Sequence, residues 1–158
     1  MEVKSGKMAD FDKTEVAKEA VKDAVSTIGY TSIESGEYTV VFSNKVMASL
    51  LGVYSSIFSA EAAQKGLSLL KDKEGELIAS DIVTLTDDPM YKDSLVKASF
   101  DDEGAATYAK NVIENGKFTT LLHNLATAAK AGVKTTGNGY KGSYASPVGI
   151  SVDSEQEL

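Results

Sequence analysis

Apolar residues recur at helical spacing in two long stretches of the chain. The first stretch contains Val16, Ala17, Ala20, Val21, Ala24, Val25 and Ile28. The second contains Val46, Met47, Leu50, Leu51, Tyr54, Ile57 and Phe58. This spacing predicts two amphipathic helices, and the bulky second stripe favours packing into a core over lining a binding groove. We expect Asp12 or Thr14 to cap the first helix and Ser43 or Asn44 to cap the second.

Runs of β-branched and aromatic residues predict the strands. We expect strands at 38–42, 77–79 and 82–85, and the sequence Asp87-Asp88-Pro89 should stop the last of these because proline cannot continue a ladder. A further strand should end at Glu114, reverse at Asn115-Gly116 and return through Leu122. Asn-Gly is the preferred pair for a two-residue hairpin turn, since both residues must take positive φ.

A short alanine-rich helix at 125–131, closed by Gly132, follows the hairpin. The order of elements predicts an α+β fold: a mixed or antiparallel sheet with two main helices and a short third. Neither an internal repeat nor a linker divides the sequence. We therefore expect a flexible lead-in at 1–12, a single domain at 13–150 and a tail at 151–158.

Composition and charge narrow the classes of function. The 158 residues are 42% hydrophobic and include no cysteine, and the first ten residues lack the apolar core of a signal peptide. These features favour a globular protein of the cytoplasm with no membrane partner. The net charge is −7 and every basic residue is lysine. Direct nucleic-acid binding is disfavoured, because arginine is the usual reader of guanine and an acidic surface repels phosphate.

Three motifs could each indicate either a chemical function or a purely structural role. Residues 137–142 spell G-x-G-x-x-G, but a nucleotide-binding loop needs a strand before it and a helix after it. The acidic pairs around Asp87 and Asp101 lack the spacing of a calcium loop, and they are typical of turns. His123 is the single histidine and lies between leucines. Without cysteine or a second histidine we expect it to be packed, although a serine triad stays arithmetically possible.

A series of short motifs resembles the TldD/PmbA family, the modulators of DNA gyrase. In chain order the motifs are A-A-Q-K-G-L-S, E-G-E-L-I-A-S, L-T-D-D-P, F-D-D-E-G-A-A-T, V-I-E-N-G, T-A-A-K-A-G and T-G-N-G. The resemblance runs from about Ala17 to Val148 and is closer to the PmbA (TldE) branch. It implies a cytoplasmic, two-subunit zinc peptidase system that degrades unfolded peptides.

In such a system the resemblance places zinc in the TldD-like partner, on a helical H-E-x-x-x-H motif and a later cysteine. Here Leu51, Gly52 and Ser56 occupy the positions of the two histidines and the glutamate, so we expect neither zinc nor catalytic residues in this chain. Family members are longer, which predicts a middle fragment that self-associates through exposed surface. The alternatives are a peptide- or protein-interaction module without a protease partner, and a gyrase-interacting protein.

The resemblance also suggests which loops line the peptide cleft. The candidate residues lie in the acidic turn, at the histidine and in the T-G-N-G loop: Asp101, Asp102, Glu103, Gly104, His123, Thr136, Gly137, Asn138 and Gly139.

Overall fold

The computed structural model describes residues 12–92, 94, 96–140 and, as backbone, 150–153. The chain divides into two compact units between Val41 and Phe42, and each unit is described by itself. The prediction of a single domain over 13–150 stays a prediction.

The first unit contains helix α1, Lys13–Ser26. Asp12 caps it as expected, because its carboxylate accepts hydrogen bonds from the Thr14 and Glu15 backbone N–H groups at 2.8 and 3.3 Å. The apolar stripe is formed, but α1 has no buried residue. Val21 and Val25 are 61% and 57% exposed. The apolar periodicity therefore predicted the helix correctly, but the apolar stripe of α1 is not buried within the first unit.

The predicted strand at 38–42 is wrong. These residues have no regular secondary structure, and their large apolar side chains are at least half exposed. The β-branched and aromatic side chains favour an extended backbone. A strand also requires a neighbour for its N–H and C=O groups, and no described strand pairs with this segment.

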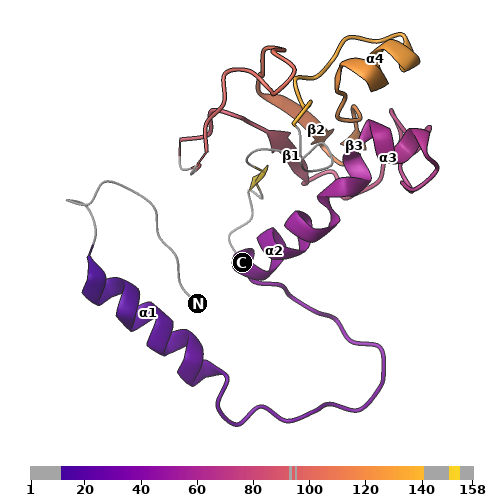
Figure 1. The fold of residues 1–158 in the computed structure, drawn as a ribbon. Helices are drawn as coiled ribbons and strands as arrows, with labels where there is room; N and C mark the ends of the chain where they lie inside the picture. Colours follow the sequence, from indigo (N-terminus) through magenta and orange to yellow (C-terminus); the bar gives the residue numbers. More distant parts are fainter. Residues whose placement is uncertain (1–11, 93, 95, 141–149, 154–158) are drawn as a thin grey trace. The chain divides into compact units, whose positions relative to one another are not determined.

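The second unit begins with three helical segments in series (Figure 1). Helix α2 spans Asn44–Tyr54 with Ser43 as its N-cap. A 3-10 turn, η2, covers Ser55–Phe58, and Ser59 then caps the short helix α3, Ala60–Gln64. The predicted apolar stripe is thus divided between elements. Its C-terminal end reaches the core through Phe58, which is 4% exposed, while Val53 near the end of α2 is 74% exposed.

The sheet is antiparallel and has the strand order β3-β2-β1-β4. Its strands are β1 Thr84–Asp87, β2 Lys110–Glu114, β3 Lys117–Phe118 and β4 Ile150–Asp153. Strand β1 begins two residues later and ends two residues later than predicted, so it includes Asp87 and stops at Asp88-Pro89. Leu77 forms only an isolated bridge with Lys117. Residues 151–153, assigned to a tail from sequence, pair with β1 instead.

The hairpin between β2 and β3 confirms the Asn-Gly prediction. Asn115 and Gly116 have φ of 48° and 78°, the two positive values that such a turn requires. The return strand is much shorter than predicted. The Thr119 N–H still donates to Val112 O at 2.9 Å, but further along Leu122 donates its N–H to Phe58 O at 2.8 Å and accepts from Ala60 N at 3.0 Å. The backbone of Leu122 is therefore hydrogen-bonded to the helical segments η2 and α3 and not to β2.

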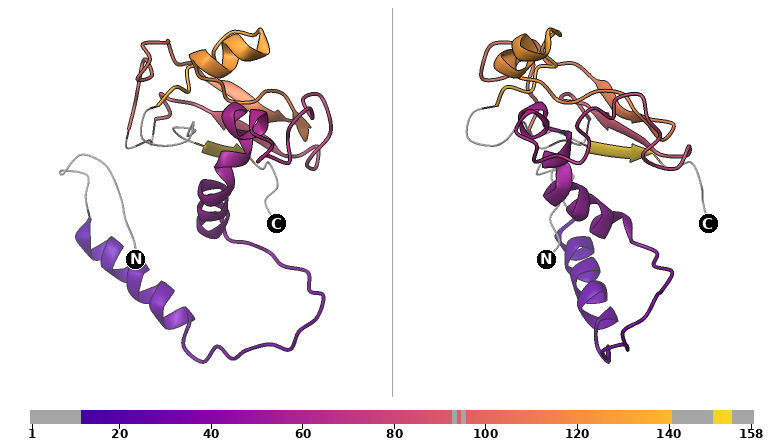
Figure 2. Two further views of the ribbon diagram at one scale, coloured as in Figure 1. Left: turned by 45° about the vertical axis from the view of Figure 1, so that its right-hand side comes forward. Right: turned by 90° about the vertical axis from the view of Figure 1, so that its right-hand side faces the viewer.

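The core lies where η2 meets the sheet (Figure 2). Its buried members are Phe58, Leu70, Leu85, Val112, Ile113, Phe118 and Leu122. The rings of Phe58 and Phe118 lie 6.2 Å apart between centroids, within the range of favourable aromatic contact. Helix α4, Leu125–Ala131, follows and ends at a left-handed Gly132, as the sequence predicted, and a capping box at Asn124 that was not predicted begins it.

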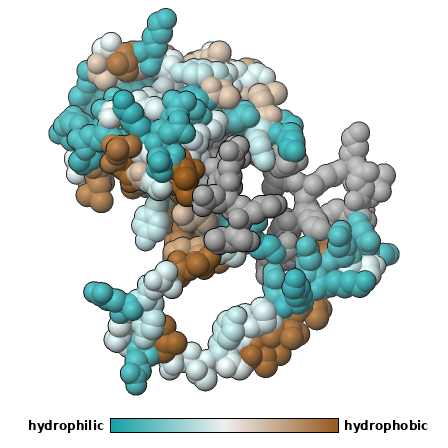
Figure 3. Space-filling model, turned by 180° about the vertical axis from the view of Figure 1, so that it is seen from behind, coloured by the Kyte–Doolittle hydropathy of each residue, from teal (hydrophilic) through white to brown (hydrophobic). Residues whose placement is uncertain are grey.

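Large hydrophobic residues also lie at the surface of both units (Figure 3). In the second unit the most exposed are Leu69 at 85%, Leu77 at 75% and Val53 at 74%. No helix within the described ranges is both long and apolar enough to cross a bilayer.

We predict that Gly116→Ala destabilises the chain more than Gly66→Ala. Both glycines have positive φ, 78° and 73°, so both substitutions carry the left-handed penalty of about 1–2 kcal/mol. A Cβ at Gly116 would lie 2.5 Å from Ala79 O, whereas one at Gly66 meets nothing within 4 Å. The clash should add about 1–3 kcal/mol at Gly116. Urea unfolding of the two variants measures the difference, and equal losses would contradict the close packing of this turn.

Candidate functional site

A buried ion pair joins the ends of two neighbouring strands. Asp87, the last residue of β1, is the cross-strand partner of Lys110, the first residue of β2. The Lys110 Nζ lies 2.8 Å from Asp87 Oδ2, and the two side chains are only 7% and 2% exposed. Such a pair is stable only when further polar contacts replace the lost water.

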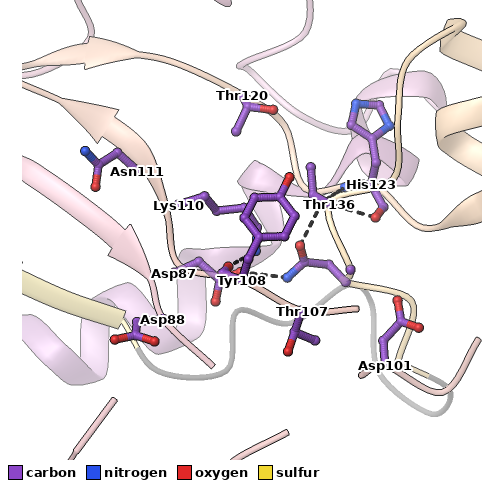
Figure 4. Close-up of polar contacts among 12 residues, drawn as sticks. Asp87, Asp88, Asp101, Thr107, Tyr108, Lys110, Asn111, Thr120, His123 and Thr136 are labelled. Carbon is purple, nitrogen blue, oxygen red and sulfur yellow. Dashed lines mark hydrogen bonds and ion pairs between the residues drawn. The ribbon is translucent and has the colours of Figure 1, made fainter. Parts of the chain in front are cut away.

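The neighbours of the ion pair supply most of these contacts. Asn138 donates from Nδ2 to Asp87 Oδ2 at 2.8 Å, which brings the T-G-N-G loop onto the sheet (Figure 4). Lys110 donates to Tyr108 O at 3.0 Å, and its ammonium lies 4.7 Å from the centre of the Tyr108 ring. Asp87 Oδ1 is buried and has no hydrogen-bond partner. The cluster is therefore well satisfied apart from one carboxylate oxygen.

Thr136 connects Asn138 to the backbone of His123. Its hydroxyl donates to Asn138 Oδ1 at 2.7 Å and accepts from the His123 N–H at 2.6 Å. Thr136 and Asn138 are 6% and 2% exposed. A continuous line of polar contacts thus runs from the ion pair to His123, as the dashed lines in Figure 4 show.

The acidic turn is held against the same loop. Asp101 Oδ1 accepts from the Glu103 and Ala105 N–H groups at 3.0 and 2.9 Å, and Asp101 Oδ2 accepts from the Gly139 N–H at 2.8 Å. Glu103 Oε2 accepts from Leu125 N at 2.7 Å, at the start of α4. These two carboxylates therefore act as acceptors that fix loops, which is the turn-forming reading of the sequence.

The structure places the predicted candidates as follows. It brings Asp101, Glu103, His123, Thr136, Gly137, Asn138 and Gly139 into one neighbourhood, and leaves Asp102 and Gly104 exposed at the tip of the acidic turn. That they line a peptide cleft stays a prediction. Sequence reasoning missed Lys110 and the pairing of Asp87, because nothing in the local pattern shows that a strand lysine is buried.

In the described part of the glycine loop, the N–H groups of residues 137–139 are already used in hydrogen bonds within the protein. Gly137 donates to Thr135 Oγ1 at 3.2 Å, Asn138 donates to His123 O at 3.4 Å, and Gly139 donates to Asp101. Helix α4 and a turn precede the loop, where a dinucleotide fingerprint needs a strand. Lys141 and Gly142 of the motif lie outside the described residues. The described part of the loop thus agrees with the rejection of nucleotide binding.

His123 is packed, as expected for a lone histidine between leucines. It is 6% exposed, and among the described residues its buried Nδ1 has no hydrogen-bond partner. Burial lowers the pKa of His123, while the Glu74 carboxylate and a backbone contact with Thr127 raise it in part. A catalytic triad needs a carboxylate or equivalent group on one ring nitrogen. The unpartnered Nδ1 has none.

Tyr140, beside the loop, is a second group with an altered pKa. Burial is the main cause that raises the pKa of its phenol, and Asp87, Asp101 and Asp102 add to this effect. A phenol of ordinary pKa is already neutral at physiological pH, and burial together with the nearby negative charge makes this one still harder to ionise.

The positions matched to the zinc motif do not fit a metal. Leu51 and Gly52 lie in α2, where Leu51 packs against the core, and Ser56 lies in η2. Leucine and glycine side chains offer no ligand, and serine is a poor one for zinc. Across the part of the chain that the structure describes, no group of three or more His, Cys, Asp or Glu residues is arranged to hold a metal ion.

The fold and the site define a small α+β domain whose loops are joined by a buried polar cluster. A family model, the PmbA/TldA metallopeptidase C-terminal domain, matches residues 35–154. The chain therefore belongs to this metallopeptidase family, which confirms the resemblance seen in the sequence.

Solved structures and relatives agree with this assignment. A protein from Thermotoga maritima that carries the name modulator of a DNA gyrase is 40% identical with a TM-score of 0.86, over 92% of this chain and 34% of that one. TldE from Thermococcus kodakarensis is 33% identical with a TM-score of 0.55, over 65% and 26%. A metalloprotease of Methanothermobacter thermautotrophicus is 33% identical over 80% and 28%. The chain thus spans about a quarter to a third of the length of these relatives.

We predict that Lys110→Met costs about 3–5 kcal/mol of unfolding free energy, because it leaves the buried Asp87 carboxylate without its counter-ion. The control is Lys65→Met, which removes an exposed pair with Glu61 and should cost about 0.5 kcal/mol or less. Denaturant unfolding checks both. The double variant Asp87→Leu with Lys110→Met should recover part of the loss, and a result no better than the single variant would contradict the pairing.

Proposed function

We propose that this chain is part of a non-catalytic, PmbA (TldE)-like subunit of a zinc metallopeptidase system of the cytoplasm. In this proposal a TldD-like partner holds the zinc and cleaves unfolded peptides. The present chain shapes the peptide cleft and supports the partner.

The observation that carries the proposal is the chemistry of the positions matched to the zinc motif. Leu51 packs against the core where a metal ligand would be needed, and Gly52 has no side chain. A hydrolytic zinc site also needs a general base beside the metal. These positions supply neither a ligand nor a base, so we assign the metal and the reaction to another chain.

The polar cluster supports a role in shaping a cleft. The T-G-N-G loop and the acidic turn are fixed to each other through Asp101 and Gly139, and to the sheet through Asn138. A surface that holds a peptide in position must itself be held by supporting contacts, because looseness of about 1 Å already weakens a site. The described loops meet that requirement.

The exposed apolar side chains support association with another subunit. Leu69, Leu77 and Val53 are each at least 74% exposed, and apolar side chains at the surface are available for contact with another subunit. The same exposure fits self-association when the partner is missing.

A second candidate is an interaction module without a protease partner. The name of the Thermotoga maritima relative, modulator of a DNA gyrase, favours one version of it, in which the chain binds gyrase. The modest charge of −7 gives little support to mimicry of DNA.

Metal analysis with a peptidase assay tests the proposal. We expect the purified chain to hold no stoichiometric zinc and to leave an unfolded peptide intact. With a TldD-like chain of the same organism, zinc should equal the partner's content and a chelator should abolish cleavage. Stoichiometric zinc with chelator-sensitive activity in this chain alone would refute the non-catalytic role.

Copurification separates the two candidates. Recovery of a TldD-like chain supports the subunit assignment. Retention of gyrase without any such chain would favour the interaction module instead.

A further inference from the structure

A short hairpin carries the acidic turn at its tip. Its two arms are joined by an isolated antiparallel bridge between Phe100 and Ala106, and the Thr107 N–H donates to Ser99 O at 3.1 Å. Successive side chains of an extended arm point to opposite faces, so the residues of this hairpin divide between two faces. The two faces have different surroundings.

The inner face is covered by the protein itself. Asp101 is 2% exposed and accepts from the Gly139 N–H at 2.8 Å. A Cβ at Gly137 would lie 2.5 Å from Ala106 O, so the T-G-N-G loop packs directly on this hairpin. The inner face is therefore occupied by a loop of the same chain.

The outer face exposes two aromatic rings. Phe100 is 67% exposed and Tyr108 is 49% exposed. Tyr108 comes two residues after Ala106, the bridge partner of Phe100, so the two aromatic residues are diagonal neighbours, which lie roughly 7–8 Å apart in a sheet. Figure 4 shows the Tyr108 ring beside Lys110, whose ammonium lies 4.7 Å from the ring centre. We call Phe100, Ala106 and Tyr108 the aromatic face.

The charges around the aromatic face are negative. Residues 98–108 include no basic residue and three acidic ones, Asp101, Asp102 and Glu103. Asp101 accepts three backbone N–H groups, which carry no net charge. Lys110 adds little positive charge at the surface, because it is paired with Asp87 and its side chain is only 7% exposed.

Two further observations agree with this charge. Burial is the main cause that raises the pKa of the Tyr140 phenol, and Asp87, Asp101 and Asp102 raise it further. Lys97, which precedes the hairpin, donates from its ammonium to Lys92 O at 3.1 Å. A ligand at the aromatic face therefore meets carboxylates rather than ammonium groups.

Arginine and lysine side chains are the ligands that such a surface favours. A cation is attracted to the face of an aromatic ring, and a guanidinium group also stacks on rings and pairs with carboxylates. An extended peptide advances about 6.6 Å for every two residues, which is close to the spacing of diagonal neighbours in a sheet. Basic residues at alternate positions of an extended peptide can therefore reach Phe100 and Tyr108 together. Acidic peptides and nucleic acid are repelled by the same carboxylates.

We propose that the aromatic face is a docking site for basic segments of unfolded peptides. Arginine or lysine side chains of the peptide stack on Phe100 and Tyr108, and Asp102 and Glu103 attract them to the hairpin. This docking site rests on the proposed function for its ligand, an unfolded peptide, and adds the chemistry of the segment that binds. It depends neither on zinc nor on cleavage, so binding to the purified chain tests it separately.

The test is fluorescence anisotropy with the full chain and two labelled Gly/Ser peptides. One peptide carries arginine at every second position, and the other carries glutamate at the same positions. We expect the arginine peptide to bind about tenfold or more tightly than the glutamate peptide and to lose affinity as salt is added. Equal affinities, or tighter binding of the glutamate peptide, would overturn the proposal.

One pair of variants separates the aromatic face from other exposed apolar side chains of the second unit. Phe100→Ala should weaken binding of the arginine peptide about two- to fivefold, the range expected for an exposed cation–π contact. Leu69→Ala removes a side chain of a residue that is 85% exposed, and it should leave binding unchanged. If both variants bind the peptide like the unmodified chain, the Phe100 ring is not the contact and the proposal fails.

A second pair of variants tests the carboxylates. Asp102→Asn removes an exposed charge beside the aromatic face, and we expect it to reduce the preference for arginine over glutamate. Asp81→Asn removes an exposed charge before the start of β1, at the end of that strand away from Asp87, and should leave the preference unchanged. Equal effects of the two substitutions would assign the preference to the overall charge of −7 and contradict a local site.

Two other results would also decide against the docking site. If the chain associates without peptide and Phe100→Ala abolishes the association, a second copy covers the aromatic face. If neither peptide binds, the face is not a peptide site, whereas the metal analysis still decides the assignment of zinc to another chain. In the unmodified chain the amide resonances of residues 99–108 should shift when the arginine peptide is added. Shifts confined to other elements contradict the proposal even where a variant does not fold.

Discussion

The second unit depends on one buried ion pair between adjacent strands. Asp87 and Lys110 oppose each other at the ends of β1 and β2, with 2% and 7% of their side chains exposed. Two charges removed from water gain little net stability, and an apolar pair of similar volume is often as stable. The ion pair instead fixes the position of a loop. Its carboxylate on the sheet accepts a hydrogen bond from Asn138, which holds the T-G-N-G loop against β1.

A series of hydrogen bonds extends from the ion pair to the neighbouring loops. Asn138 is connected to His123 through Thr136, and Gly139 is bonded to Asp101 in the acidic turn. The step between Thr136 and Asn138 joins two side chains, and in the other two steps the backbone N–H groups of His123 and Gly139 are the donors. Substitutions along this line should consequently act together, because neighbours in a shared polar network are not independent.

The family assignment and the chemistry of the chain are separate conclusions. The match over residues 35–154 and the similar solved structures establish the metallopeptidase family and its fold. Function depends on the residues of a site, and one fold can host active and inactive members. Leucine, glycine and serine stand at the positions matched to the zinc motif, so the family name by itself does not make this chain a peptidase.

The sequence by itself determined the features that depend on neighbouring residues. Helix periodicity, the helix end at Gly132 and the Asn115-Gly116 turn are local, and each was predicted correctly. The caps Asp12 and Ser43 were each one of two predicted candidates. Seven of the nine candidate residues named from the family-like motifs lie in one neighbourhood, and their place in a peptide cleft stays a prediction.

Only the tertiary structure decided what depends on partners distant in sequence. The segment 38–42 has strand composition but no strand beside it, and Leu122 pairs with the helical segment rather than with β2. The burial of Lys110 was likewise invisible, because it follows from an aspartate 23 residues earlier in the chain. Pairing and desolvation are properties of the folded chain, and a local pattern does not contain them.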